Sequence, residues 1–168
     1  MIHVCSLAHM PATVEETGAR HIITVMGKIS QVQRPPSVDE ANHLMISMDD
    51  ITAEAAGFNA PNEGHVQQVL DFVRHWDRTT PMVVHCYAGI SRSTASAFVA
   101  ACALNPARSE AEIAHQIREA SPFAWPNPLI VRIGDGLLGR NGRMIRALDE
   151  IGPGDLSFEG RPFRVDLE

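Results

Sequence analysis

The sequence lacks the features that would place the protein in a membrane, on a nucleic acid or in an oxidising compartment. No apolar run reaches the roughly 18 residues of a membrane-spanning helix, and no basic segment precedes an apolar stretch near the start, as a signal peptide requires. Basic residues are outnumbered, with 14 Lys and Arg against 20 Asp and Glu, and they form no run that would bind a nucleic acid. We therefore predict a cytoplasmic protein that binds neither membranes nor nucleic acid, and we favour a monomer.

Cysteine is also scarce. The three cysteines, Cys5, Cys86 and Cys102, are an odd number without the spacing of metal ligands. This pattern argues against a disulfide framework and a zinc site, and it predicts reduced thiols, with Cys5 and Cys102 in the core. Eight histidines are present, but none pairs with a further ligand at helical spacing. We expect no metal and no cofactor.

What the sequence does have is an alternation of short β-branched runs with amphipathic segments. The order is strand, helix, strand, strand, helix, strand and then several helices, with strands expected at 2–7, 21–26, 43–50 and 81–86. This order indicates an α/β fold in which helices flank a largely parallel central sheet of about four to five strands, giving three layers. The later helices are expected at 63–76, 91–104, 109–120, 127–139 and 143–151.

The length of the chain suggests a single domain over residues 1–168, with a core of about 1–152. The tail, 153–168, alternates apolar and polar residues around Glu159 and Gly160. This alternation allows a small hairpin.

The stretch VVHCYAGISRST, Val83 to Thr94, follows an apolar run and precedes an Ala-rich helix. In a turn of small residues the backbone N–H groups can curl inward to form a nest for an anion, and the positive end of the next helix points at the same place. Gly89 is free to adopt a positive φ, and Arg92, in the first helical turn, can hold two anion oxygens. The pattern predicts a site for a tetrahedral dianion, lined by Tyr87, Ala88, Gly89, Ile90, Ser91 and Arg92.

The same loop favours the thiolate of Cys86, because hydrogen-bond donors and positive dipole ends stabilise a negative charge at the start of the loop. Cys86 is therefore predicted to be an ionised nucleophile. The Ser93 hydroxyl can donate to the sulfur and improve it as a leaving group in a second step. We interpret His85 as a brace that hydrogen-bonds backbone, and not as a base. The other interpretation of Cys86, a buried structural thiol, requires none of these neighbours.

The segment HCYAGISRST resembles the Cys-x5-Arg signature of the cysteine-dependent protein tyrosine phosphatases, and it looks most like the dual-specificity branch, as a compact domain of bacterial type. The resemblance is dense over 83–94, weaker from about 43 to 140, and absent from the first 40 residues and the tail. It implies a phosphotyrosine-phosphatase-like fold and a covalent phosphocysteine at Cys86. It also implies that Arg92 clamps the equatorial oxygens and that an aspartic acid on a separate loop protonates the leaving oxygen.

The segment SMDDITAE offers two candidates for that acid. If residues 46–50 take the place of the family's usual strand ending in Asp, then Asp50 is the acid and Asp49 its neighbour, with Asp49 as the alternative. Both acids end a predicted strand at the sheet edge where Cys86 ends another, and α/β sheets place their sites at the carboxyl ends of strands. Paired acids after a strand also occur as turn residues or helix N-caps.

The resemblance implies a phosphomonoester hydrolase that acts on phosphotyrosine in proteins, with dual specificity as an extension. The partner is then a phosphorylated protein or a small phosphomonoester. No metal is required, because Arg92 and the loop amides supply the positive charge. A phosphoinositide, nucleotide or RNA-end phosphatase is a second interpretation, disfavoured because residues 87–91 contain no lysine and the chain is acidic. A third is a phosphate-binding module without catalysis.

Overall fold

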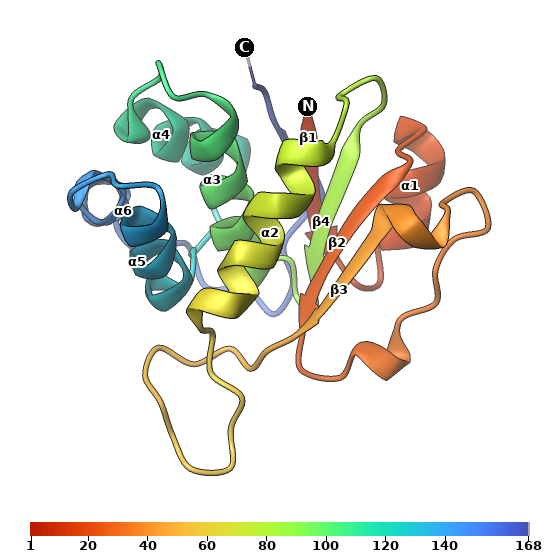
Figure 1. Cartoon of the computed structure of the whole chain (residues 1–168), viewed down its shortest axis with the longest axis horizontal. Coiled ribbons are helices and arrows are strands. Elements are labelled where there is room, and N and C mark those ends of the chain that lie inside the picture. Colours follow the sequence, from red (N-terminus) through yellow and green to blue (C-terminus); the bar gives the residue numbers. More distant parts are fainter. Residues whose placement is uncertain (168) are drawn as a thin grey trace.

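The computed structural model describes residues 1–167 and places a five-stranded sheet between helices (Figure 1). The strands and longer helices are, in chain order, β1 (Ile2–Ser6), α1 (Met10–Thr17), β2 (His21–Met26), β3 (His43–Ser47), α2 (Glu63–His75), β4 (Met82–Cys86), α3 (Arg92–Leu104), α4 (Glu110–Ala120), α5 (Pro128–Leu137), α6 (Arg143–Ile151) and β5 (Phe163–Val165). Two short 3₁₀ turns, Ile29–Gln31 and Glu40–Asn42, lie between β2 and β3.

The strand order is β3-β2-β4-β1-β5, and every pairing is parallel except that of β5 with β1. All five residues of β4 are buried, as expected for the middle strand of a sheet covered on both faces. The predicted α/β class with a largely parallel sheet is confirmed. The third strand ends at Ser47, earlier than predicted, so that Asp49 and Asp50 lie on the loop that follows it.

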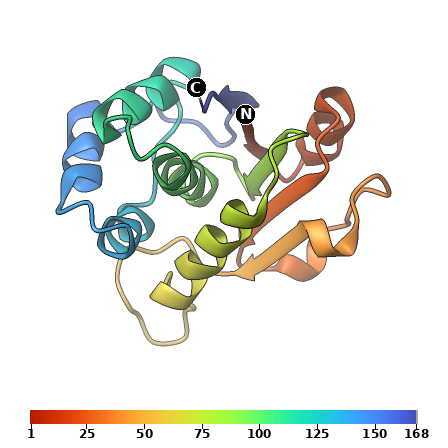
Figure 2. The ribbon, with the colours of Figure 1, turned by 45° about the horizontal axis from the view of Figure 1, so that its top comes forward.

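The two faces of the sheet carry different cores. On one face, strand side chains that include Cys5, Ile22 and Val83 pack against Met10 and Val14 of α1. The alternate residues of the same strands face a much larger cluster formed with α2 to α6. Figures 1 and 2 show this arrangement, with α1 alone on one side of the sheet and the other long helices on the opposite side. The chain thus forms the three expected layers.

Local sequence explains where the helices begin. The Asn62 side chain accepts a hydrogen bond from the His65 N–H and caps α2, whose predicted apolar face is buried. Ser109 and Glu112 form the predicted capping box at the start of α4. In the part of the chain that the structure describes, no helix is long and apolar enough to cross a membrane.

The tail does not form the small hairpin that alternation allowed within 153–168. Its single strand among the described residues, β5, pairs with β1 in antiparallel register, and the last residue of the predicted hairpin lies outside the described part. The reason is that Phe163 and Val165 are buried against β1, whereas Leu156 and Phe158, on the other predicted arm, are 91% and 102% exposed. Strand β5 covers an edge of β1 that would otherwise be unpaired.

Candidate active site

The predicted anion loop connects the end of β4 to the start of α3. Cys86 is the last residue of β4 and Arg92 is the first residue of α3, so the N-terminus of a 13-residue helix points at the loop. The β3 loop approaches from two strands away, and the Ser91 hydroxyl donates to Asp50 Oδ1 at 2.7 Å. The structure therefore brings the cysteine loop and the paired acids together at one sheet edge, as predicted.

Two polar groups surround the sulfur of Cys86, whose side chain is only 2% exposed. The Gly89 N–H donates to Sγ at 3.2 Å, and the Ser93 hydroxyl lies 3.1 Å from Sγ on the first turn of α3. Gly89 has φ +73°, and a Cβ there would lie 2.7 Å from the backbone carbon of Cys5 and the backbone nitrogen of Ser6. Only glycine fits both this backbone conformation and the close approach of β1.

Arg92 is oriented by the chain that carries the acids. Its Nη1 donates to the carbonyl oxygen of Met48 at 2.8 Å. Its Nε is buried without a hydrogen-bond partner among the described residues. A buried guanidinium donor left unpaired is costly, and an anion oxygen in the loop would satisfy it.

The two acids have different partners. Asp50 Oδ1 accepts from the Ser91 hydroxyl and, at 2.8 Å, from the side-chain amide of Asn127. The oxygen of the same Asn127 amide accepts from two backbone N–H groups and so caps the start of α5. No sequence pattern predicts the contact between Asn127 and Asp50, because the residues lie far apart in the chain.

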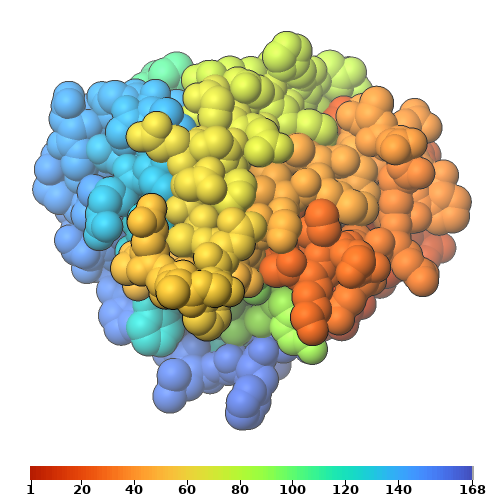
Figure 3. Space-filling model, turned by 60° about the horizontal axis from the view of Figure 1, so that its bottom comes forward, coloured from red at the N-terminus to blue at the C-terminus, as the bar shows by residue number. Residues whose placement is uncertain are grey.

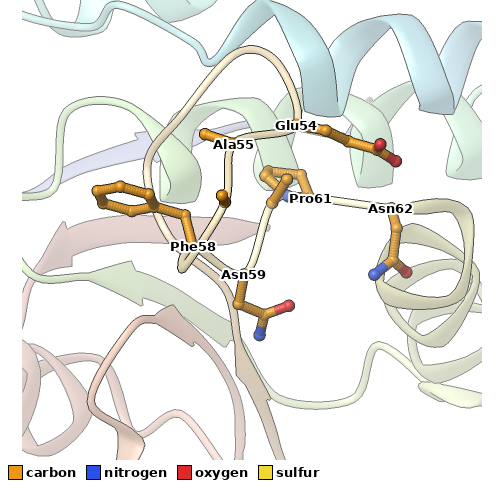
Figure 4. A pocket seen from close by; sticks show the side chains of 8 residues that line it. Glu54, Ala55, Phe58, Asn59, Pro61 and Asn62 are labelled. Carbon is orange, nitrogen blue, oxygen red and sulfur yellow. The ribbon is translucent and has the colours of Figure 1, made fainter.

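The hydrogen bonds of Asp49 go to the segment that follows it in the chain. Its Oδ2 accepts from the Asn59 N–H at 2.7 Å, and its own N–H donates to the Asn59 carbonyl oxygen at 2.7 Å. Asp49 therefore fixes the base of the segment 51–62, which encloses a cavity of about 470 Å³ (Figure 4). In Figure 4, Phe58 points to one side of this segment and Asn62 to the other.

A cavity of about 440 Å³ opens beside the loop. Its lining includes Arg92, both aspartates, Tyr87 and Phe58. Figure 3 shows the face onto which it opens, with the golden 51–62 segment and the orange segment before β3 bordering the green of the loop. Lys28, the single lysine of the sequence, also lines it. No motif in the sequence points to Lys28, since it comes from the part of the chain without a recognisable pattern.

A buried polar chain runs across three strands beneath the loop. His85 Nδ1 lies 3.2 Å from the carbonyl oxygen of Cys86, and its Nε2 lies 2.7 Å from the Thr24 hydroxyl. The same hydroxyl lies 2.8 Å from His43 Nε2. If Nδ1 of His85 is the protonated nitrogen, it donates to Cys86 O, Thr24 donates to His85, and His43 donates to Thr24.

Both histidines of this chain are held neutral at physiological pH. Burial lowers the pKa of His85 to about 4, and burial likewise lowers the pKa of His43 to about 4. A neutral His85 bonded to backbone agrees with a bracing role better than with that of a base. Thr24 and His43 were not among the predicted site residues. The available signal was a polar threonine between apolar residues of a strand.

The other two cysteines are buried, as predicted. Burial raises the pKa of the Cys5 thiol to about 12 and that of the Cys102 thiol to about 12. Cys5 packs against α1, whereas Cys86 belongs to the cluster on the opposite face of the sheet. No group of three or more His, Cys, Asp or Glu side chains that could hold a metal occurs within residues 1–167.

Comparison with known proteins agrees with this geometry. Residues 56–123 match the protein-tyrosine phosphatase family. The human tyrosine phosphatase-like serine/threonine/tyrosine-interacting protein is 15% identical, with a TM-score of 0.64 over 83% of this chain and 92% of that one. Human DUSP28 is 19% identical, with a TM-score of 0.61 over 83% and 89%. PTPMT1, solved in complex with PI(5)P, is 14% identical, with a TM-score of 0.60 over 84% and 94%. No curated protein sequence matches the chain.

Proposed function

We propose that the chain is a phosphoric monoester hydrolase of the protein-tyrosine phosphatase family, whose model matches residues 56–123, and that it removes phosphate from phosphotyrosine in proteins through a phosphocysteine on Cys86. The observation that supports this most is the set of donors gathered around one buried sulfur. The Gly89 N–H donates to Sγ, the Ser93 hydroxyl lies 3.1 Å from it, and the Nε of Arg92 has no hydrogen-bond partner among the described residues. An oxygen of a phosphoryl group on the sulfur would accept from the free Nε.

In the first step the thiolate of Cys86 attacks phosphorus in line with the leaving oxygen. The S–P bond forms as the P–O bond to the tyrosine breaks. Arg92 holds two equatorial oxygens, and the Met48 carbonyl keeps its guanidinium in that orientation. The carboxyl of Asp50 gives its proton to the departing phenolate oxygen.

In the second step water attacks the phosphocysteine. The Asp50 carboxylate now takes a proton from the water while the S–P bond breaks. The Ser93 hydroxyl, 3.1 Å from Sγ, donates to the sulfur and stabilises the returning thiolate. Inorganic phosphate leaves, and Cys86 and Asp50 regain their starting protonation states.

Asp50 is the better candidate acid because its carboxylate contacts the loop itself. Ser91 and Asn127 both donate to Oδ1, which leaves Oδ2 without a hydrogen bond in the described part of the chain. In Asp49, by contrast, Oδ2 accepts a hydrogen bond from the Asn59 N–H. We therefore assign proton transfer to Asp50 and the anchoring of the segment 51–62 to Asp49.

Leaving-group dependence tests this assignment. Asp50→Ala should lower kcat by about 10² to 10⁴ with a phosphotyrosine peptide, whose phenolate needs a proton, and much less with p-nitrophenyl phosphate. Asp49→Ala, the matched control, should mainly destabilise the neighbouring segment and show no such contrast. Equal and small losses in both variants would refute the assignment.

Catalysis itself is tested with p-nitrophenyl phosphate. The pure protein should turn it over between pH 5 and 8, vanadate should inhibit it, and Cys86→Ser should abolish it. Since the serine hydroxyl is not ionised at these pH values, the variant keeps the shape of the loop but loses the nucleophile. Absence of turnover by the wild type would refute the proposal.

A phosphoinositide is the second candidate substrate, because Lys28 brings another cation to the cavity of Arg92. Two aspartates line the same cavity, and the loop from Tyr87 to Ser91 carries no lysine, which favours the protein substrate. The acidic net charge of −6 also disfavours anionic membranes and nucleic acids. We further propose that the chain works as a single phosphatase unit, as a cytoplasmic monomer.

A further inference from the structure

Exposed aromatic side chains gather around the candidate site. The sequence has six Phe, two Trp and one Tyr, and the exposed members of this set are Phe58, Tyr87, Trp125 and Phe158. Phe58 and Tyr87 line the cavity of Arg92, and the Trp125 N–H donates to the Ile90 carbonyl oxygen in the loop. Exposed aromatics that gather on one face indicate a binding surface.

Phe158 and Tyr87 form the walls of a separate groove. This groove has a volume of about 460 Å³, and its lining residues are Leu7, Ala8, Tyr87, Ala88, Phe158 and Glu159. Tyr87 lines both this groove and the cavity of Arg92, so the two adjoin at this residue. Figure 3 shows the blue C-terminal tail beside the green of the loop.

The turn that carries Phe158 is held in place although its side chain is fully exposed. The Gly160 N–H donates to the Ala88 carbonyl oxygen at 2.9 Å, which ties the tail to the loop. The neighbouring Glu159 carboxylate accepts from the Ser6 hydroxyl at 2.5 Å and lies 3.3 Å from His9 Nδ1. The backbone of this turn is fixed while the apolar ring of Phe158 is exposed to solvent. This combination is typical of a side chain that becomes buried when a ligand binds.

We propose that this groove is a substrate subsite for an apolar side chain one or two positions from the phosphorylated residue of a protein substrate. This inference rests on the proposed function, since it needs the phosphotyrosine in the cavity of Arg92. An extended peptide advances about 3.3 Å per residue, so a near neighbour of that residue can cross Tyr87 and reach Phe158. The lining favours this occupant over an anionic lipid, because its one charged member is Glu159 and no described lining residue is basic.

The test uses phosphotyrosine peptides with Leu placed singly at positions −2, −1, +1 or +2 of an otherwise Ala background. We expect Leu at one position to raise kcat/KM about tenfold over the all-Ala peptide, because the groove covers much of an apolar side chain. In Phe158→Ala this ratio should fall below about twofold. Leu156→Ala is the matched control: Leu156 lies on the same tail, is 91% exposed and does not line the groove, so it should leave the ratio unchanged.

Equal kcat/KM for all peptides, or a Leu preference that survives Phe158→Ala, would overturn the subsite. Turnover of p-nitrophenyl phosphate by the wild type keeps this failure distinct from failure of the proposed function. Co-sedimentation with phosphatidylcholine vesicles, with and without a phosphoinositide, is the second measurement. Binding that Phe158→Ala removes would assign the aromatic side chain to a membrane surface and overturn the peptide subsite. Absence of vesicle binding together with a Phe158-dependent Leu preference supports it.

Discussion

A buried neutral histidine beneath the loop makes the stability of the protein depend on pH. His85 is 0% exposed, and its burial lowers the pKa from 6.5 to about 4 in the folded protein. The unfolded chain therefore binds more protons than the folded one between these two values. Stability rises with pH across this window, and it is lost as pH falls from about 6.5 toward 4.

The size of the effect follows from the two pKa values. With 6.5 in the unfolded chain and about 4 in the folded protein, lowering the pH from 7 to 5 costs about 2 kcal/mol through His85 alone. Most carboxylates remain ionised over this range, so they contribute little. His43, whose pKa is also lowered by burial, changes the stability in the same direction.

The measurement is urea unfolding of the wild type and of His85→Gln at pH 7, 6 and 5. The wild type should lose about 2 kcal/mol more than the variant between pH 7 and 5, because glutamine does not titrate. The variant is expected to be less stable at pH 7, since the brace to Cys86 is altered, and this does not affect the comparison of slopes. Equal pH dependence in both proteins would show that His85 does not titrate as its burial requires.

Two further substitutions test contacts that hold the loop. Thr24→Val leaves the Nε2 atoms of His85 and His43 without their partner and should cost about 2 to 3 kcal/mol in urea unfolding at pH 7, whereas Thr24→Ser keeps the hydroxyl and should cost about 1. A loss with Ser as large as that with Val would contradict the hydrogen-bond chain. Gly89→Ala should cost well over 2 kcal/mol and abolish turnover, because its Cβ would meet the backbone of β1 at 2.7 Å. Gly57→Ala, at φ +81° with no atom within 4 Å, is its control and should cost only about 1 kcal/mol, so equal losses would refute the steric argument.

The sequence was sufficient wherever the cause is local. The loop from Cys86 to Ser93 takes its shape from small residues, one glycine and the helix that follows, and all of these are neighbours in the chain. The buried face of α2 follows from its period, and the start of α4 follows from the Ser109 and Glu112 spacing. The fold class could be predicted from the order of such segments. Connections between consecutive elements are short and right-handed, so few sheet topologies are possible for a given order of strands and helices.

The contacts that the sequence could not give come from strands and loops joined only by the fold. Thr24, His43 and His85 lie on β2, β3 and β4, which are neighbours in the sheet but not in the chain. The choice between Asp49 and Asp50 depends on Asn127, whose partner is 77 positions away. No period or spacing in the sequence encodes such pairings.

The pairing of β5 with β1 in the C-terminal tail affects both the fold and the surface beside the site. Strand β5 covers the edge of β1, and the segment before it must then cross the carboxyl ends of β1 and β4, where the loop of Cys86 lies. There the Gly160 N–H meets the Ala88 carbonyl oxygen, and a Cβ on Gly160 would lie 2.8 Å from the Gly89 carbonyl oxygen. This close crossing places Phe158 and Tyr87 in the lining of one groove. A tail that instead folded on itself as a hairpin would leave the loop without this wall, so the edge pairing of β5 determines the shape of the groove.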